Sequence, residues 1–451
     1  MVSSANSASV DLLGTVDLLH RYVEKALCEG VFDEVRDRER RRLWTLERLA
    51  EFWIAVILRA PASLTQALSE GMGGGGHYPA VRGTRQGFFE RCRTLSSVFF
   101  STLFERFCGL VTKNEPARFA SHESTLLGRF GHIFLLDGSS LDRVTRRLKA
   151  LHEDRRIPLA GSIAAAYDLG LGAPTAIAFE RTPQGKELPM ARALLAKLPP
   201  GSLCVGDRLY GIPKFFEALS NAGLWGLCRR SRLTNLERVE QLSVTSKGDE
   251  RIEDWLVDYG TDPKTKGQRL RFIRWTDGRR SREVLTNVLD PEQLSAADAL
   301  RLYEERWSVE RMFYDLKEVL NLHRFYAANT NAVAMQVYAA AMVYVAMRVA
   351  QGRIAEEAKI EPEAISPKRL FPKVAAASSS LTNSELAFEA TCQVNPHVTL
   401  KKPDWRQFPF TRTRVVDILR ETRDPHRRRR PRCPAAERCR PLPRAPRRPT
   451  D

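Results

Sequence analysis

The spacing of apolar residues predicts helices over most of the first 128 residues. Between residues 43 and 57, apolar side chains recur every three or four positions, and residues 88–110 repeat this spacing. Side chains spaced in this way gather on one face of a helix, which can then pack against a core. We therefore expect a helical N-terminal region over residues 1–128.

From residue 131 the apolar residues come in short runs, which are typical of buried strands. Three runs follow one another directly, at residues 133–136, 162–167 and 174–179. Helical and strand-like stretches then alternate, in the order helix 188–198, strand 203–205, helix 213–222 and strand 224–228. This order predicts an α/β fold in which helices flank a mixed sheet.

Residues 230–291 have a different texture, with polar loops and clusters of Lys and Arg. Two strand-like runs, 270–276 and 283–289, are joined across Asp277 and Gly278. An Asp-Gly pair between such runs is a strong hairpin signal, so we expect a small β insertion here. Its cations and aromatic residue form either a phosphate contact surface or a set of solvated edge-strand charges. These residues are Arg271, Arg274, Trp275, Arg279, Arg280 and Arg282.

Helical spacing returns at residues 295–321 and 332–357. The longest apolar run, 332–347, is interrupted by Gln336 and is too short to predict a membrane span. We therefore interpret this run as a buried helix and expect no membrane partner.

The charge balance points to a polyanionic partner. Among the 451 residues, 71 are Lys or Arg and 54 are Asp or Glu, which gives a formal net charge of +17. Such an excess is typical of proteins that bind nucleic acid. In residues 421–451, eleven Arg and seven Pro are incompatible with an apolar core, so we expect a disordered basic tail. This tail is either a nonspecific phosphate-binding arm or a dispensable extension.

The remaining composition favours a reduced, cytoplasmic protein. The eight cysteines include no Cys-x-x-Cys pair, and residues 1–6 contain no charged segment that leads into an apolar run. The first observation argues against structural zinc and the second against a secretory signal. The glycine-rich run at 71–76 is followed by His77 rather than by the residues that close a phosphate loop, so we expect no nucleotide cofactor.

Three acidic residues stand where a two-metal site for phosphoryl transfer would need them. Asp137 follows the run 133–136, Asp207 follows the run 203–205, and Glu310 lies in the helix 295–321. Carboxylates at the ends of neighbouring strands can converge, and their oxygens are the ligands that hard divalent cations prefer. Each residue alone would more often be a cap or a turn residue, so only the set is specific.

Three nearby residues have simpler explanations. His132 could tune such a site, and Asp142 or Asp168 could supply a fourth carboxylate. A core or surface position for the histidine, and turn or cap roles for the two acids, require no special arrangement. We expect these structural roles.

The helix 295–321 carries a sharper pattern. At about 100° per residue, Tyr303, Arg306, Glu310 and Lys317 lie within roughly a 60° arc of one helix face. A carboxylate beside Arg and Lys can hold a metal ion while its neighbours hold phosphate oxygens. The same helix has many other charged residues, so a solvated salt-bridge face explains the pattern equally well.

The spacing Tyr303-x2-Arg306-x3-Glu310-x6-Lys317 resembles the Tyr-Arg-Glu-Lys signature of a large group of bacterial insertion-sequence transposases. That group has a DDE catalytic triad and a ribonuclease-H-like fold. The resemblance implies the same core here, in which a mixed sheet is flanked by helices.

Two further segments carry the resemblance. Residues 135–140, Leu-Leu-Asp-Gly-Ser-Ser, resemble the first Asp motif, and residues 205–211, Val-Gly-Asp-Arg-Leu-Tyr-Gly, resemble the second. A β insertion before the Glu helix also fits the group. Together these features cover about residues 130–330.

The resemblance implies that Asp137, Asp207 and Glu310 are catalytic and bind two Mg2+ or Mn2+ ions. It also implies a set of residues that contact DNA. Trp307 and Trp275 are candidates for stacking against a base, but a buried core position is the role that we favour for either. The implied DNA contacts are Tyr303, Arg306, Lys317, Arg208 and Trp307.

The implied function is cut-and-paste DNA transposition. Metal-activated water would cleave a phosphodiester at the end of the element, and the resulting 3′-hydroxyl would attack target DNA. The implied partners are terminal inverted repeats, target DNA and a second copy in a homodimeric synaptic complex, which would associate with the nucleoid when bound to DNA. Two alternatives stay open: a catalytically inactive DNA-binding repressor, and a metal-dependent nuclease that transfers no strand.

These inferences divide the chain into six regions, each with an expected role. They are 1–128 for transposon-end binding, 129–229 for the first part of the catalytic core, 230–291 for the β insertion, 292–360 for the core helices that carry the Glu, 361–420 for synapsis, and 421–451 for the disordered tail.

Overall fold

The computed structural model describes most of the chain between residues 9 and 377. The described residues are 9–11, 18–19, 22–35, 43–73, 78–79, 83–115, 118–119, 124–141, 161–180, 187–260, 267–327, 329–377 and 412–414. The expected tail 421–451, most of the region 361–420, and Asp142 lie outside the described residues.

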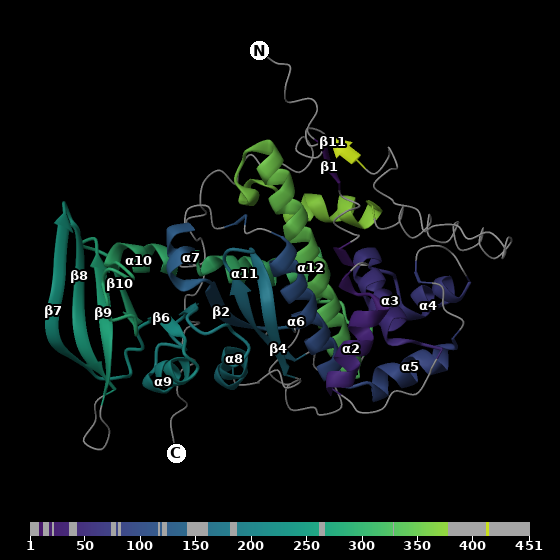
Figure 1. Cartoon of the computed structure of the whole chain (residues 1–451), viewed down its shortest axis with the longest axis horizontal. Coiled ribbons are helices and arrows are strands. Elements are labelled where there is room, and N and C mark those ends of the chain that lie inside the picture. Colours follow the sequence, from purple (N-terminus) through teal and green to yellow (C-terminus); the bar gives the residue numbers. More distant parts are fainter. Residues whose placement is uncertain are drawn as a thin grey trace, which may run out of the picture.

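A nine-stranded mixed sheet runs through the molecule in the order β4-β3-β2-β5-β6-β10-β9-β8-β7 (Figure 1). β3 runs antiparallel to β2 and to β4, whereas β5 runs parallel to both β2 and β6. The five strands predicted from apolar runs between residues 133 and 228 are therefore confirmed. Their bounds are β2 Ile133–Ser140, β3 Ser162–Asp168, β4 Ala173–Glu180, β5 Leu203–Gly206 and β6 Trp225–Arg229.

Alternate residues of β2 enter two different cores, one on each face of the sheet. Ile133 and Leu135 belong to a larger core that includes residues of α10, α11 and α12. Phe134 and Leu136 belong to a smaller core that includes residues of α8 and α9. Because successive side chains of a strand point to opposite faces, α8 and α9 cover one face of the sheet, and α10, α11 and α12 cover the other. The helices are α8 Glu187–Leu195, α9 Pro213–Asn221, α10 Ala296–Glu305, α11 Trp307–Tyr314 and α12 Thr330–Ala358.

The described part of the N-terminal region is helical, as its apolar spacing predicted. The stretch 88–110 divides into two helices near Ser96, whose hydroxyl accepts the Val98 N–H and caps the second helix. The N-terminal helices are α2 Lys25–Val35, α3 Leu46–Arg59, α4 Leu64–Met72, α5 Arg85–Thr94, α6 Ser97–Asn114 and α7 Ser124–Phe130. A short strand, β1 (Ser9–Asp11), pairs antiparallel with β11 (Arg412–Arg414).

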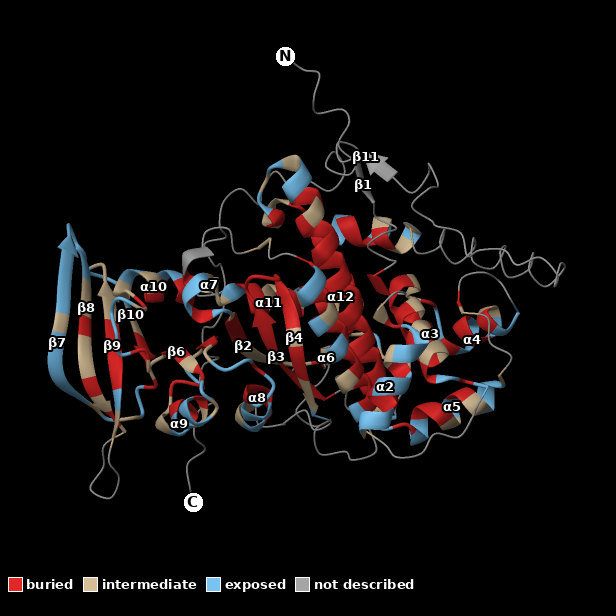
Figure 2. Cartoon of the chain, viewed as in Figure 1, coloured by how far each residue is buried: buried red, intermediate tan, exposed pale blue. Residues whose placement is uncertain are grey.

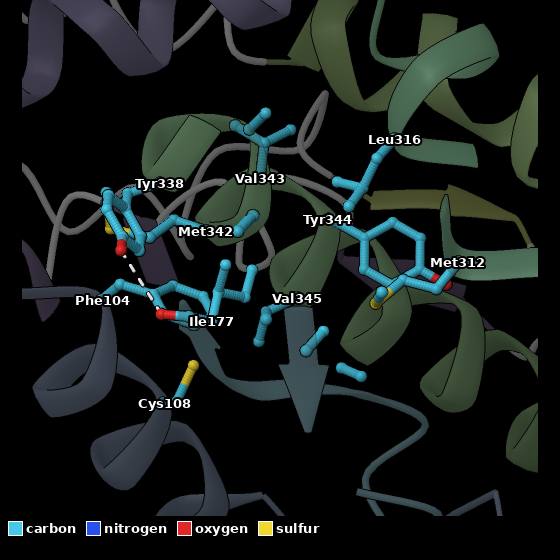
Figure 3. Close-up of a cluster of buried hydrophobic side chains, with 14 of the residues drawn as sticks. Phe104, Cys108, Ile177, Met312, Leu316, Tyr338, Met342, Val343, Tyr344 and Val345 are labelled. Carbon is cyan, nitrogen blue, oxygen red and sulfur yellow. Dashed lines mark hydrogen bonds between the residues drawn. The ribbon is translucent and has the colours of Figure 1, made fainter. Parts of the chain in front are cut away.

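The long helix α12 forms the spine of the larger core, as Figure 2 shows by its almost continuous burial. Its 29 residues are long and apolar enough to cross a membrane, but its most apolar window is wholly buried inside the protein. On one side the Tyr338 hydroxyl donates to the Ile177 carbonyl of β4 at 3.3 Å (Figure 3). Tyr344 lies near Met312 and Leu316 on another side (Figure 3). The interpretation of residues 332–347 as a buried helix is therefore confirmed.

The β insertion is larger than the sequence predicted. The predicted hairpin corresponds to β9 (Gln268–Thr276) and β10 (Ser281–Thr286), but β7 (Leu236–Lys247) and β8 (Glu250–Tyr259) were missed. β7 is the edge strand, and most of its residues are exposed (Figure 2). A strand exposed on both faces has no apolar alternation by which it could be predicted. Because β10 pairs with β6, all four strands extend the central sheet.

Arg271 has neither of the surface roles predicted for it, because its side chain is fully buried in the sheet. Its guanidinium donates to both carboxylate oxygens of Asp254 on β8, at 2.5 and 3.2 Å. It also donates to the carbonyls of Val288, Asp290 and Leu294 in the connection that leads to α10. One buried cation therefore joins the insertion to the helical segment that carries Glu310.

Replacing Arg271 with Met should lower the free energy of unfolding by about 3–5 kcal/mol, because Asp254 would stay buried without its partner. Chemical denaturation of the full chain measures this loss. Arg269→Met is the matched control, since Arg269 on the same strand pairs with Asp258 in an exposed position and should leave the midpoint unchanged. If the two substitutions lowered the free energy of unfolding equally, the buried pair would contribute no more to stability than the exposed pair does.

Candidate active site

Asp137 and Asp207 occupy equivalent positions on two neighbouring parallel strands. The register pairs Leu135 of β2 with Val205 of β5, and each aspartate lies two residues further along its own strand direction. Asp207 directly follows β5, but Asp137 lies inside β2, which was expected to end before it and instead continues to Ser140. The carboxyl ends of parallel strands share one edge of a sheet, so Asp137 and Asp207 both lie at that edge.

The segment that carries Glu310 is not one continuous α-helix, as the 100° spacing assumed. α10 ends at Glu305, Arg306 forms a turn, and α11 begins at Trp307. A π-helix then covers Asp315–Val319, which contains Lys317. Breaks of this kind change the direction of the side chains that follow, so the arrangement of these residues has to be taken from their contacts.

Arg306 brings two of the three predicted acids together. Its Nη1 atom lies 2.6 Å from Oε1 of Glu310 and 4.0 Å from Oδ2 of Asp137. Its guanidinium also lies 5.9 Å from the centre of the Tyr303 ring. Tyr303, Arg306 and Glu310 therefore share one face that points to the end of β2, and the guanidinium partly balances two carboxylates.

The electrostatics of this edge are dominated by the burial of Asp137. Burial raises the pKa of Asp137 to about 7, and the neighbouring Glu187 carboxylate adds to the rise. Arg306 and a hydrogen bond from the Gly138 backbone act in the opposite direction, and Glu310 adds a smaller increase. Keeping a poorly solvated acid near other acids costs free energy. Unfavourable arrangements of this kind are frequent at functional sites.

Glu187 is a fourth acid at this edge that the sequence did not reveal. It is the first residue of α8. Burial raises its pKa, and the Asp207 carboxylate raises it further. Glu187 therefore lies within electrostatic reach of both strand aspartates. No motif or spacing in the sequence links it to them, because its position depends on how α8 packs against the sheet.

Lys317 contacts the strand end directly. Its Nζ atom donates to the Ser139 hydroxyl at 2.6 Å and to the Ser140 carbonyl at 2.5 Å. The lysine that was expected to contact phosphate thus also ties the π-helix to the last residues of β2. The two residues that it contacts lie two and three positions after Asp137 on the strand.

The two remaining candidates, Arg208 and Trp307, are exposed. Arg208 follows Asp207 and points into solvent. The side chain of Trp307 is 45% exposed, with the Arg306 guanidinium 5.2 Å from its ring. The alternative of a buried core position for Trp307 is therefore wrong, and both side chains are accessible to a ligand at this edge.

His132 and Asp168 have the structural roles that were expected of them. The Asp168 carboxylate accepts the Leu171 N–H within the turn after β3, and its other oxygen lies 2.9 Å from Nδ1 of His132. The hydrogen bond to Asp168 raises the pKa of His132 above its usual value. Asp168 is thus a turn residue with a histidine partner, and Glu187 rather than Asp168 stands beside Asp137.

The His132–Asp168 pair should make stability depend on pH. Because the pKa of His132 is raised in the folded protein, the stabilisation is complete below about pH 6.5, the value for the unfolded chain, and is lost as the pH rises through the folded-state pKa. His132→Gln should therefore lower the melting temperature more at pH 6 than at pH 9. An equal loss at both pH values, measured by differential scanning calorimetry, would contradict this.

The carboxylate oxygens at this edge are ligands that suit divalent cations. In this structure, however, the carboxylates do not lie at metal-ligand distances from a common point. In the part of the chain that the structure describes, no three His, Cys, Asp or Glu side chains stand close enough to hold a metal ion. The acids are nevertheless hard oxygen donors, and the Arg306 guanidinium lies between two of them. The residues present therefore fit Mg2+ or Mn2+ by the chemistry of their oxygen atoms and not by their spacing in this structure.

Comparisons with known proteins point to the class that the sequence motifs resemble, the transposases with a DDE catalytic triad. Residues 132–346 match the family model described as transposase DDE domain. This range contains all the residues of the edge described above. It also contains the whole β insertion.

Two curated relatives carry transposase names. The first, "Probable transposase for insertion sequence element IS5377" of Geobacillus stearothermophilus, is 30% identical over 135 residues, which are 30% of this chain and 34% of that protein. A protein of Sinorhizobium fredii that carries the name transposase y4zB is 31% identical over 153 residues, 33% of this chain and 43% of that protein. The chain thus matches less than half the length of either relative. Together with the family model, they support a transposase of the insertion-sequence type.

A solved structure gives only a weak likeness. The piggyBac transposase synaptic complex with hairpin DNA, determined by cryo-electron microscopy, superposes with a TM-score of 0.38 and 11% identity over 90% of this chain and 91% of that chain. A similarity of this size carries no argument about fold or function.

Proposed function

We propose that this protein is a DNA transposase that cleaves the ends of an insertion sequence and joins them to target DNA. The observation that carries the proposal is the convergence of Asp137, Asp207 and the Tyr303–Arg306–Glu310 face on one edge of the sheet. The match of residues 132–346 to a transposase DDE domain supports it. The strand order β4-β3-β2-β5-β6, in which only β3 runs antiparallel to the other four strands, supports a ribonuclease-H-like core.

In this proposal Asp137, Asp207 and Glu310 hold two Mg2+ or Mn2+ ions. When bound, such ions activate water and stabilise the attacking and leaving oxygens of an in-line phosphoryl displacement. In the first reaction a water oxygen bonds to the phosphorus at the element's end and the bond to the 3′-oxygen breaks. In the second, the freed 3′-hydroxyl bonds to a target phosphorus, and the bond from that phosphorus to the target strand's own 3′-oxygen breaks and leaves a 3′-hydroxyl on the target.

The cations of the edge then orient the DNA backbone. While Nη1 of Arg306 stays on Glu310, the remaining N–H groups at the accessible end of the guanidinium would donate to a phosphate oxygen. Tyr303, behind the guanidinium, limits its movement. Lys317 is positioned at the end of β2, where it can reach the same phosphate.

The proposal includes the partners that transposition requires. Terminal inverted repeats and target DNA would bind across this edge, and two copies of the chain would bring two ends together in a homodimeric synaptic complex. Residues 1–128 would bind the ends, and residues 361–420 would contribute to synapsis. We place this activity in the bacterial cytoplasm, at the nucleoid.

Asp137→Asn, Asp207→Asn and Glu310→Gln should each reduce Mg2+-dependent cleavage and strand transfer about a hundredfold or more, because several kcal/mol of transition-state stabilisation would be lost. The assay uses a supercoiled plasmid that carries the flanking repeats. Glu304→Gln is the matched control, since Glu304 lies on α10 and forms an exposed pair with Arg282. It should retain activity.

The products distinguish the proposed function from its alternatives. Joined products that disappear in the three acid variants support a transposase. Cleavage without joining indicates a nuclease, and binding of the repeats without cleavage by the unmodified chain indicates an inactive DNA-binding protein. Cleavage that persists when all three acids are replaced would overturn the assignment of these residues.

Binding to DNA should weaken with salt, with log affinity falling by about 0.9 per neutralised phosphate for each unit of log salt concentration. Arg208→Gln should make this slope shallower by about one unit, because an exposed cation beside Asp207 would no longer contact a phosphate. Fluorescence anisotropy with a labelled duplex between about 50 and 200 mM salt covers the range where the change is large. Affinity that does not respond to salt would remove DNA as the partner.

A further inference from the structure

Glu187 reaches the acidic edge through a gap that a glycine leaves in β2. Along β2, Phe134 and Leu136 face the core that contains α8, so Gly138 lies on that same face by the alternation of the strand. A Cβ atom at Gly138 would lie 2.5 Å from the Cδ atom of Glu187, which is closer than such atoms can approach. The missing side chain is therefore what admits the Glu187 carboxylate.

Two donors fix the Glu187 carboxylate in this gap. The Tyr210 hydroxyl, which is fully buried, donates to Oε1 at 2.5 Å. The Gly138 backbone forms a second hydrogen bond with the carboxylate. Gly138 follows Asp137 directly, and Tyr210 lies three residues after Asp207. The two segments that carry these aspartates therefore both hold the Glu187 carboxylate.

These contacts do not by themselves require a negative charge. A glutamine at position 187 would still accept from Tyr210 through its amide oxygen. A partly buried carboxylate within electrostatic reach of two others is unfavourable unless a cation offsets it. Among the described residues, no Lys or Arg lies within ion-pair distance of Glu187, whereas Arg306 serves the other side of the site.

We infer that Glu187 is a fourth carboxylate of the metal-binding site, held in place by Tyr210 and admitted by Gly138. This inference rests on the proposed function, since it assigns Glu187 to the same divalent cations. Each carboxylate oxygen can accept more than one contact, so the hydrogen bonds to Glu187 leave lone pairs for a metal ion. Hydrogen bonds to a ligating carboxylate orient it, and Tyr210 supplies that orientation here.

Mn2+ binding to the full chain, followed by isothermal titration calorimetry without DNA, tests this inference independently of activity. Glu187→Gln should weaken Mn2+ binding about 10- to 100-fold, and Tyr210→Phe should weaken it less, because the carboxylate remains but is no longer oriented. Glu217→Gln is the matched control, since Glu217 is an exposed carboxylate on α9 and should bind Mn2+ as the unmodified chain does.

Thermal unfolding supplies a second readout that a merely structural residue would not produce. Without metal, Glu187→Gln should raise the melting temperature, because it removes charge repulsion near Asp137 and Asp207. With Mn2+, the unmodified chain should gain stability by mass action, and the variant should gain much less. A variant that is destabilised without metal and gains as much from Mn2+ as the unmodified chain would show Glu187 to be a structural residue only.

Asp137→Asn separates this inference from the proposed function. If Asp137→Asn abolishes Mn2+ binding and Glu187→Gln leaves it unchanged, the metal site stands and the role of Glu187 is overturned. If the unmodified chain binds no Mn2+, both the metal site and the role of Glu187 are overturned. Loss of binding in both variants, with Glu217→Gln unaffected, supports the inference.

Discussion

Repulsion between acids at the carboxyl end of β2 is the constraint on which the rest of the molecule depends. Asp137 is mostly buried, and Glu187 and Glu310 both act on it. Like charges in a poorly solvated place separate unless a rigid frame holds them. The parallel register of β2 and β5 fixes one pair of acids. The buried helix α12 packs near Met312 and Leu316 and so supports the segment that carries Glu310 (Figure 3).

Arg306, at the one-residue interruption between α10 and α11, places a cation beside these acids. It lies four residues before Glu310, so both side chains share one helix face. From this face the guanidinium contacts Glu310 and approaches Asp137, and Lys317 in the π-helix that follows contacts Ser139. The segment is therefore tied to β2 on both sides of Glu310. π-Helical turns are frequent at functional sites because they redirect side chains in this way.

The sequence predicted the parts of the site that local patterns encode. Apolar runs located β2 and β5, and the positions of Asp137 and Asp207 followed from the ends of those runs. Glu187 could not be found in this way, because the gap at Gly138 and the helix that fills it are distant in sequence. The exposed edge strand β7 has no alternation, so it was missed. The sequence predicted a surface position for Arg271, because the burial of a charged side chain can be predicted only when its partner is known.

Several local rules are broken at the same point of the fold. Gly138 lies inside a central strand, where glycine is normally unfavourable, and the partly buried Glu187 rather than an apolar side chain packs against it. Opposite it, a helix turns and becomes a π-helix. Each feature alone would reduce stability. Natural sequences break such rules mainly where function requires it. The convergence of these features on the end of β2 therefore supports the proposed site on physical grounds, independently of any resemblance in sequence.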